Sequence, residues 1–422
     1  MVVMSDESGR LGVFLDRVGR VAGAPASVVS TGSGHDAWRG RDGQGVCVGG
    51  ARRGGGAGGH RKGRIMGDES MAGLLAALPV DDWAEPRRLL GAYPAAARRT
   101  AFMLVRPEAV RQGQVPDIVA WLGERGFGVT ALRVVRPHHR RLEELYRYTQ
   151  VRLMDAGSRP LWWYMPRYYR LGPAVALLLD RPGDVPAAER LSELKGPSNP
   201  GLSEPGLLRY EFGSQNMVMC VVHTSDLPET AVRESCLFLG SDAVESVLRG
   251  ADGGTRRDLA PAEVVDRLVA GGVPTRAVRL PNFHQVLAGL QARIVRRSAG
   301  PTSDRAASLE QLAAGPLSDL DYGRRTAALH EWWSTEGHDV LAVLDPDDEA
   351  EAFLAWSARL EGTWAALTDR VIDRLRELGH DIDLWAEVSL ETGLGFHDMV
   401  MTRLAPTTDD AVMSLADLKA PL

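Results

Sequence analysis

The sequence predicts an α/β protein of the α+β type, with a four-stranded antiparallel sheet covered by helices and a helical region after it. Between residues 98 and 240, apolar runs of strand-like composition alternate with amphipathic stretches in the order βαββαβ, with extra helices between the second and third strands. Beyond residue 240 the pattern becomes that of successive short amphipathic helices. The two regions therefore differ in class.

Each element of the first region follows from its local pattern. The expected strands are 101–106, 127–135, 174–180 and 216–222. The expected helices are 107–124, 138–150, 185–195 and 226–239, with a tight aromatic segment at 161–170 and a loop at 196–215.

The last strand leads directly to a histidine. The run Asn216 to Asp226, NMVMCVVHTSD, is apolar up to His223 and then becomes polar. A helix follows, with Asp226 or Ser225 as the expected N-cap, and a helix N-terminus favours anionic ligands. His223 is therefore either a reactive group at a phosphate site or a hydrogen-bonded core histidine.

Composition and charge indicate a soluble globular protein of two to three domains. The 422 residues are 44% hydrophobic and 25% charged. Residues 301–422 hold 9 Lys and Arg against 24 Asp and Glu, a net charge of −15, so the total of −6 leaves +9 for residues 1–300. A basic cleft suits polyphosphate, whereas the acidic region argues against nucleic acid and could dock on a basic surface. The alternative is that both regions are solvated faces.

Cysteine usage and hydropathy predict a reducing, cytoplasmic compartment and no membrane partner. Cys47, Cys220 and Cys236 show no paired spacing, so neither a disulfide framework nor a metal motif is expected. The N-terminus lacks the apolar core of a signal peptide, and no apolar run approaches the length of a membrane span.

The first 65 residues are predicted to be a disordered, glycine-rich leader. Their composition offers little apolar surface to offset the entropy of ordering. An alternative is that translation starts at Met66 or Met71. The glycine run 51–60 is not expected to be a phosphate loop, because no strand precedes it and no Gly-Lys-Ser/Thr follows. Residues 66–97 are expected to form a short helical lead-in.

Six motifs in order between residues 98 and 240 resemble those of nucleoside diphosphate kinases. Thr100 to Val110 resembles that family's first strand with its Lys-Pro-Asp-Ala-Val motif. The others are 126–135 for the second strand, 171–179 for the third, Gly196-Pro-Ser-Asn-Pro200 for a Gly-Ala-Thr-Asn-Pro loop, 208–213 for Ile-Arg-Gly-Asp-Phe, and Val222-His-Thr-Ser-Asp226 for Ile-His-Gly-Ser-Asp. The resemblance covers about a third of the chain and implies a ferredoxin-like fold for this region.

The resemblance also implies an ATP-dependent phosphotransferase that acts through a phosphohistidine on a nucleoside diphosphate or a related acceptor. His223 matches the nucleophile. The matching catalytic supports are Glu234, Ser225, Tyr146 and Arg106. The implied nucleotide-binding positions are Arg209, Ser198, Lys195, Trp162, Met217 and Cys220. Mg²⁺ would arrive with the nucleotide near Asp226, without a protein cage, and the family's trimers and hexamers imply a possible homo-oligomer.

Several positions depart from the family pattern and put the activity in doubt. Arg106 replaces the motif lysine, and Cys220 and Met219 replace an asparagine and an arginine before the histidine. Thr224 stands where the family has glycine, and Leu161 or Trp162 stands where it has the base-stacking phenylalanine. Ser192 occupies the position of a second phosphate-binding arginine, whose role Lys195 or Arg190 could take. About seven extra residues lie between Tyr146 and Arg159.

The region after residue 240 is expected to form a helical extension at 241–297, a linker at 298–305 and an acidic helical domain at 306–422. Within it, 261–271 and 283–297 are amphipathic, and 347–379 carries the longest helical pattern. The four histidines of the acidic domain lack metal spacing and its five tryptophans are expected in the core rather than in a ligand cage: His330, His338, His380, His397, Trp332, Trp333, Trp356, Trp364 and Trp385.

Two functions from different classes remain open at this point. The first is a phosphotransferase resembling nucleoside diphosphate kinase. The second is a catalytically impaired nucleotide-binding regulatory module, in which the acidic helical domain carries the output through an unknown protein partner. Labelling with γ-labelled ATP separates them, because phosphohistidine survives base but not acid.

Overall fold

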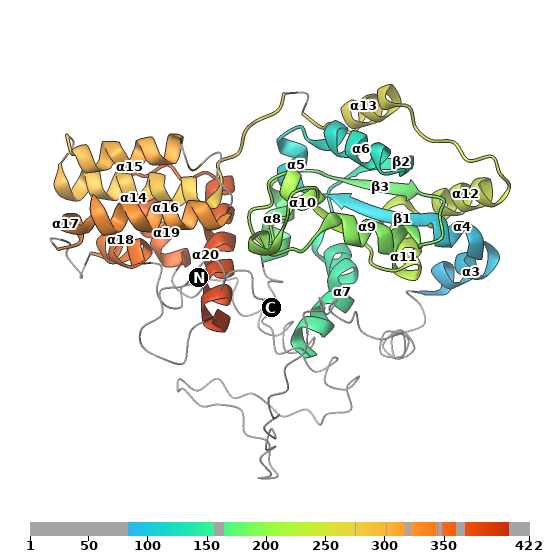
Figure 1. The fold of residues 1–422 in the computed structure, drawn as a ribbon, viewed down its shortest axis with the longest axis horizontal. Helices are drawn as coiled ribbons and strands as arrows, with labels where there is room; N and C mark the ends of the chain where they lie inside the picture. The colour runs from blue at the N-terminus through green and yellow to red at the C-terminus, as the bar shows by residue number, and fades with distance from the viewer. Residues whose placement is uncertain are drawn as a thin grey trace, which may run out of the picture. The chain divides into compact units, whose positions relative to one another are not determined.

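A computed structural model describes residues 83–155, 164–274, 276–300, 302–315, 317, 322–342, 344, 348–359 and 368–404. The chain from Ala84 onward forms one compact unit (Figure 1). The predicted leader, the larger part of the predicted lead-in, Cys47 and Trp162 lie outside the described residues. The described end of the lead-in consists of helices α3 (Ala84–Ala92) and α4 (Pro94–Arg99).

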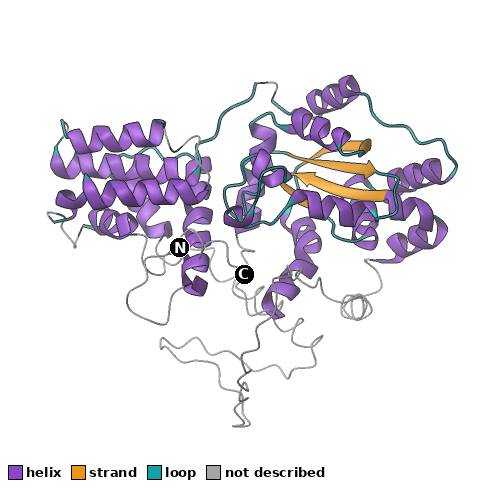
Figure 2. Ribbon diagram, viewed as in Figure 1, coloured by secondary structure: helices purple, strands orange, loops and turns teal. Residues whose placement is uncertain are grey.

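Four antiparallel strands form one sheet in the order β2-β3-β1-β4 (Figure 2). They are β1 (Thr100–Val105), β2 (Gly128–Val135), β3 (Ala174–Asp180) and β4 (Val222–Thr224). Every residue of the two central strands, β1 and β3, is buried, as their continuous apolar sequences require. This order gives the ferredoxin-like arrangement of an α+β fold, as predicted.

Helices cover the sheet and position the loops at its edge. They are α5 (Pro107–Arg111), α6 (Val115–Glu124), α7 (His139–Asp155), α8 (Tyr164–Arg170), α9 (Ala187–Lys195) and α11 (Pro228–Leu239). Helix α11 crosses β1, β2 and β3, and its Phe238 ring stacks on Phe102 of β1 at 5.6 Å. The predicted helix 107–124 is divided because Gly113 adopts a φ of +71°.

The predicted strand 216–222 is wrong, because only Val222–Thr224 pairs with β1. The Asn216 side chain accepts hydrogen bonds from the amides of Val218 and Met219, both at 2.8 Å, and so closes a turn. The apolar run is buried within this turn, and His223 lies in the middle of β4. The predicted loop 196–215 contains a 3₁₀ turn, η2 (Pro200–Leu202), and helix α10 (Leu208–Glu211).

The predicted N-cap of α11 is also wrong. The N-cap is Leu227, and α11 begins at Pro228. The Ser225 hydroxyl donates to Glu234 instead, and the Asp226 carboxylate accepts from Ser192 and Lys195. Both side chains are therefore used in tertiary contacts and neither one caps the helix.

The described residues form two hydrophobic cores. The first contains the sheet and extends through α12 (Ser241–Asp252) and α13 (Pro261–Ala270), with Val244 and Val264 among its buried members. The second begins with α14 (Phe283–Ala299). The predicted helical extension 241–297 is thus divided between the two cores. Between them lies the segment 271–282, most of whose described residues are exposed, and the predicted linker 298–305 spans the end of α14 and the start of α15.

The second core is a bundle of helices, as the sequence predicted. It comprises α14, α15 (Asp304–Ala314), α16 (Tyr322–Thr335), α17 (His338–Leu341), α18 (Glu349–Arg359), α19 (Thr368–Glu377) and α20 (Leu384–Leu404). The predicted long helical pattern at 347–379 is represented by α18 and α19. Among the helices that the structure describes, none is long and apolar enough to cross a membrane.

Candidate functional site

His223 stands at the β4 edge of the sheet, with one nitrogen held by a carboxylate. It lies opposite Leu104 of β1, and its side chain is 13% exposed. Its Nε2 is 2.9 Å from Glu234 Oε2 on α11, which also accepts the Ser225 hydroxyl at 2.6 Å. Because an ionised carboxylate only accepts, Nε2 carries the proton and the Nδ1 lone pair remains available as a nucleophile.

Tyr146 and Arg106 lie against the other side of this histidine. The Tyr146 ring meets the His223 imidazole edge-on, with centroids 5.3 Å apart. Arg106 Nη2 donates to the Tyr146 hydroxyl at 3.1 Å, and this hydroxyl lies 3.0 Å from that of Tyr169 on α8. Burial raises the pKa of Tyr146, so it remains a neutral donor and acceptor beside the imidazole.

The turn that leads to His223 has a strained backbone at Val221. This β-branched residue has a φ of +69°, the only positive φ among described residues other than glycine. Glu108 Oε1 accepts its N–H at 2.8 Å, and its carbonyl accepts the Arg106 N–H at 2.9 Å. Glu108 also accepts the Tyr168 hydroxyl, and burial raises the pKa of this carboxyl group. The start of α5, which follows β1, thereby holds the turn that precedes the histidine.

Arg209, a predicted phosphate ligand, is engaged with the backbone. Its Nε, Nη1 and Nη2 donate to the carbonyls of Cys220, Gly196 and Val222 at 3.1, 3.0 and 2.9 Å. The guanidinium thus joins the loop after α9 to the turn before His223. Cys220, which stands where the family has asparagine, is fully buried, with its thiol near the carbonyl of Met217.

Lys195 and Ser192 both contact Asp226. Lys195 Nζ lies 3.1 Å from Asp226 Oδ1, and the Ser192 hydroxyl donates to the same oxygen at 2.6 Å. Although burial opposes it, these partners hold the pKa of Asp226 well below its ordinary value. Arg190, the other candidate replacement for the missing arginine, pairs instead with Glu193 at 2.8 Å.

The remaining predicted nucleotide contacts are half-buried. Ser198 lies in the loop after α9, next to Asn199, whose side chain accepts from Gly201 and caps η2. Met217 belongs to the turn closed by Asn216. Trp162 lies outside the described residues.

A metal cage is not formed by the residues that the structure describes, where no cluster of three or more histidine, cysteine or acidic side chains occurs. Asp226 is the acidic group that fits a magnesium ion carried by a nucleotide. Its side chain is 42% exposed, lies near His223 and remains ionised. One carboxylate oxygen beside water suits Mg²⁺, which keeps most of its water ligands.

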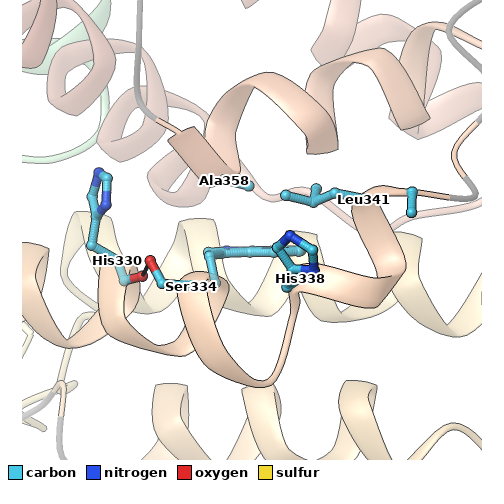
Figure 3. Close-up of a pocket in the computed structure, with 7 residues that line it drawn as sticks. His330, Ser334, His338, Leu341 and Ala358 are labelled. Carbon is cyan, nitrogen blue, oxygen red and sulfur yellow. Dashed lines mark hydrogen bonds between the residues drawn. The ribbon is translucent and has the colours of Figure 1, made fainter.

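A cavity of about 350 Å³ lies elsewhere, among α16, α17 and α18 of the second core (Figure 3). His330 and His338 project beside it, and Trp333 forms part of its wall. None of its lining residues is a predicted site residue. The cavity therefore does not coincide with the predicted site around His223.

Sequence reasoning missed three groups around His223: Glu108, Tyr169 and Asn216. Asn216 was detectable, since asparagine before an apolar run is a turn signal. The other two have no local signal. Glu108 binds the amide of Val221, 113 positions away, and Tyr169 contacts the hydroxyl of Tyr146, 23 positions away.

Comparisons with known proteins identify relatives of residues 99–244. A family model for nucleoside diphosphate kinase matches residues 99–244. The nucleoside diphosphate kinase of Synechococcus elongatus is 31% identical over 137 residues, which are 32% of this chain and 85% of that protein. The Moorella thermoacetica nucleoside diphosphate kinase is 30% identical over 143 residues, which are 34% of this chain and 94% of that protein.

A crystal structure of the Aquifex aeolicus nucleoside diphosphate kinase is also similar. It shares 27% identity and covers 33% of this chain and 93% of that one, with a TM-score of 0.28. Residues 99–244 match the family model, and the Synechococcus elongatus relative, 31% identical, is covered over 85% of its length. The chain therefore belongs to the nucleoside diphosphate kinase family.

Proposed function

We propose that this protein transfers the γ-phosphoryl group of ATP to a nucleoside diphosphate through a phosphohistidine at His223. The observation that carries the proposal is the orientation of the imidazole. Glu234 holds Nε2 at 2.9 Å, and Ser225 fixes that carboxylate at 2.6 Å, so Nδ1 is the nitrogen left for attack.

In the first half-reaction, the Nδ1 lone pair of His223 attacks the γ-phosphorus. The bond from this phosphorus to the bridging oxygen breaks, and the electron pair leaves with ADP. The ring gains positive character while Nε2 keeps its proton. Glu234, 6% exposed, stabilises that charge more strongly than a solvated carboxylate would.

In the second half-reaction, a terminal oxygen of the nucleoside diphosphate attacks the same phosphorus. The P–N bond breaks and its electron pair returns to Nδ1, which restores the neutral imidazole. Both steps use one site because donor and acceptor carry the same diphosphate group. Tyr146, held by Arg106 and Tyr169, limits the movement of the ring between the two steps.

Magnesium bound to the nucleotide would neutralise phosphate charge, and Asp226 is the residue that would face it through water. Lys195 keeps this carboxylate ionised while it also adds positive charge near the phosphates. The family relationship further supports a cytoplasmic homo-oligomer as part of the proposal.

One observation favours a second candidate, a nucleotide-binding regulatory module. All three nitrogen atoms of the Arg209 guanidinium already donate to backbone carbonyls, and Lys195 is paired with Asp226. If these contacts persist with nucleotide bound, the phosphates gain less stabilisation in the transition state. Binding would then occur without turnover.

The deciding experiment incubates the full chain with γ-labelled ATP and magnesium, followed by an alkaline gel. We expect base-stable, acid-labile label on the wild type and on His139→Ala, which removes an exposed histidine of α7. His223→Ala should bind ATP and take up no label. Adding unlabelled GDP should release the label as GTP. Label on His223→Ala contradicts the nucleophile, and wild-type protein that binds ATP without label supports the regulatory candidate.

A further inference from the structure

Helix α20 belongs to both hydrophobic cores. Trp385 and Val388 pack on the first core, which contains the sheet, whereas Leu390 and Leu394 belong to the second. On a helix these two sets lie on opposite faces, since each residue turns by about 100°. The C-terminal helix is therefore a direct contact between the helical bundle and the domain that carries His223.

The face of α20 toward the first core ends in a buried hydrogen bond to the turn before His223. Asn216 Nδ2 donates to Thr392 Oγ1 at 3.1 Å, and both side chains are fully buried. The Thr392 hydroxyl proton goes to the Val388 carbonyl at 2.7 Å, so its oxygen is set as an acceptor. Helix α20 therefore fixes Thr392 as the acceptor and Asn216 as the donor of this hydrogen bond.

The same asparagine shapes the turn. Its Oδ1 accepts from the amides of Val218 and Met219, so the orientation of one side-chain amide fixes both ends of the contact. The Val218 carbonyl in turn accepts a hydrogen bond from Arg106 Nη1. Because Arg106 also donates to Tyr146, which packs on His223, a continuous set of contacts runs from α20 to the imidazole.

A second contact reaches the site through α8. Arg167 forms ion pairs with Glu387 and with Glu391, the latter at 2.7 Å. Arg167 precedes Tyr168 and Tyr169 on α8, which contact Glu108 and Tyr146. Helix α20 therefore contacts both the turn before His223, through Asn216, and helix α8, through Arg167.

Resting on the function proposed above, we propose that Asn216 is a positioning residue for phosphoryl transfer and that the helical bundle sets its position through Thr392. The bundle is then part of the catalytic unit of this chain. When the Thr392 contact is lost, the turn carrying Val218 relaxes, and Arg106 and Tyr146 no longer hold His223 at the phosphorus.

The test compares Thr392→Val, Thr392→Ser and Ser389→Ala in the full chain. Valine keeps the shape of threonine but leaves the Asn216 donor buried without an acceptor, while serine keeps the acceptor. Ser389 is a buried hydroxyl on α20 that has no hydrogen-bond partner among the described residues, so its loss controls for an altered helix. Phosphorylation of His223 is measured in single turnovers at saturating ATP, well below each melting temperature.

We expect Thr392→Val to slow phosphorylation by about tenfold or more with an unchanged dissociation constant for ATP, since small misplacements of reacting groups mainly affect the chemical step. Thr392→Ser and Ser389→Ala should remain within about twofold of the wild type. Equal rates for Thr392→Val and wild type, or an equal loss in Ser389→Ala, overturn the proposal.

Hydrogen exchange separates this proposal from the proposed function. Amide exchange is followed in peptides spanning residues 216–223, and it needs no activity. If wild-type protein never becomes labelled, the proposed function fails. Faster exchange of these amides in Thr392→Val alone still supports the positioning role, and unchanged exchange refutes it.

Discussion

Replacement of Glu234 by glutamine tests the electrostatic support of His223 most directly. Glutamine keeps the size of the side chain and an acceptor oxygen but removes the negative charge. The carboxylate is 6% exposed and holds Nε2 at 2.9 Å, so little solvent is available to replace it. Hydrogen bonds to charged groups contribute roughly 1.5–3 kcal/mol.

If that contribution is made only when the ring becomes positive, the loss appears in the rate. At about 1.4 kcal/mol per factor of ten, Glu234→Gln should slow phosphorylation of His223 roughly 10- to 150-fold. Binding of ATP should change little, because the carboxylate contacts the imidazole and Ser225 rather than the phosphates.

The assay is rapid-quench labelling at saturating ATP, with the dissociation constant measured separately. Glu229→Gln is the matched control, since Glu229 lies exposed in the first turn of the same helix, α11. A Glu234→Gln rate within twofold of the wild type would refute the assigned role of the carboxylate. An equal loss in both variants would indicate a general effect of charge on α11.

Two further predictions concern stability and domain division. Asp226→Asn should lower the free energy of unfolding above pH 5, and its deficit relative to the wild type should shrink as the pH falls below about 3.9. The reason is that the unfolded chain takes up a proton at the ordinary aspartate pKa, whereas the folded carboxylate, with its lowered pKa, stays ionised. Urea titrations between pH 6 and pH 3 measure this, and a constant deficit would contradict the ion pair. Trypsin should cut within 271–282, at Arg276, before it cuts near 298–305, since Arg296 and Arg297 are paired with Glu310 and Asp348. Fragments that end at Arg297 or Arg305 first would restore the linker predicted from sequence.

The sequence alone determined the central strands of the sheet, and the family resemblance identified His223 as the candidate nucleophile. Continuous apolar runs at 101–106 and 174–180 can be satisfied only in the middle of a covered sheet, and they became β1 and β3. The resemblance also implied Glu234, eleven residues after His223, as its partner, and the two side chains meet because only a short strand, a turn and one helix separate them. The strands depend on local periodicity.

Only the tertiary structure decided how the turn before His223 is built and what holds it. The run 216–222 has the composition of a strand, but Asn216 closes a turn there, and its second partner, Thr392, lies 176 residues away. Val221 adopts its unfavourable φ because Glu108 and Arg106, at the start of α5, bind its amide and carbonyl. Apolar composition reports that a segment is buried, whereas its backbone path depends on distant hydrogen-bonding partners that no local pattern specifies.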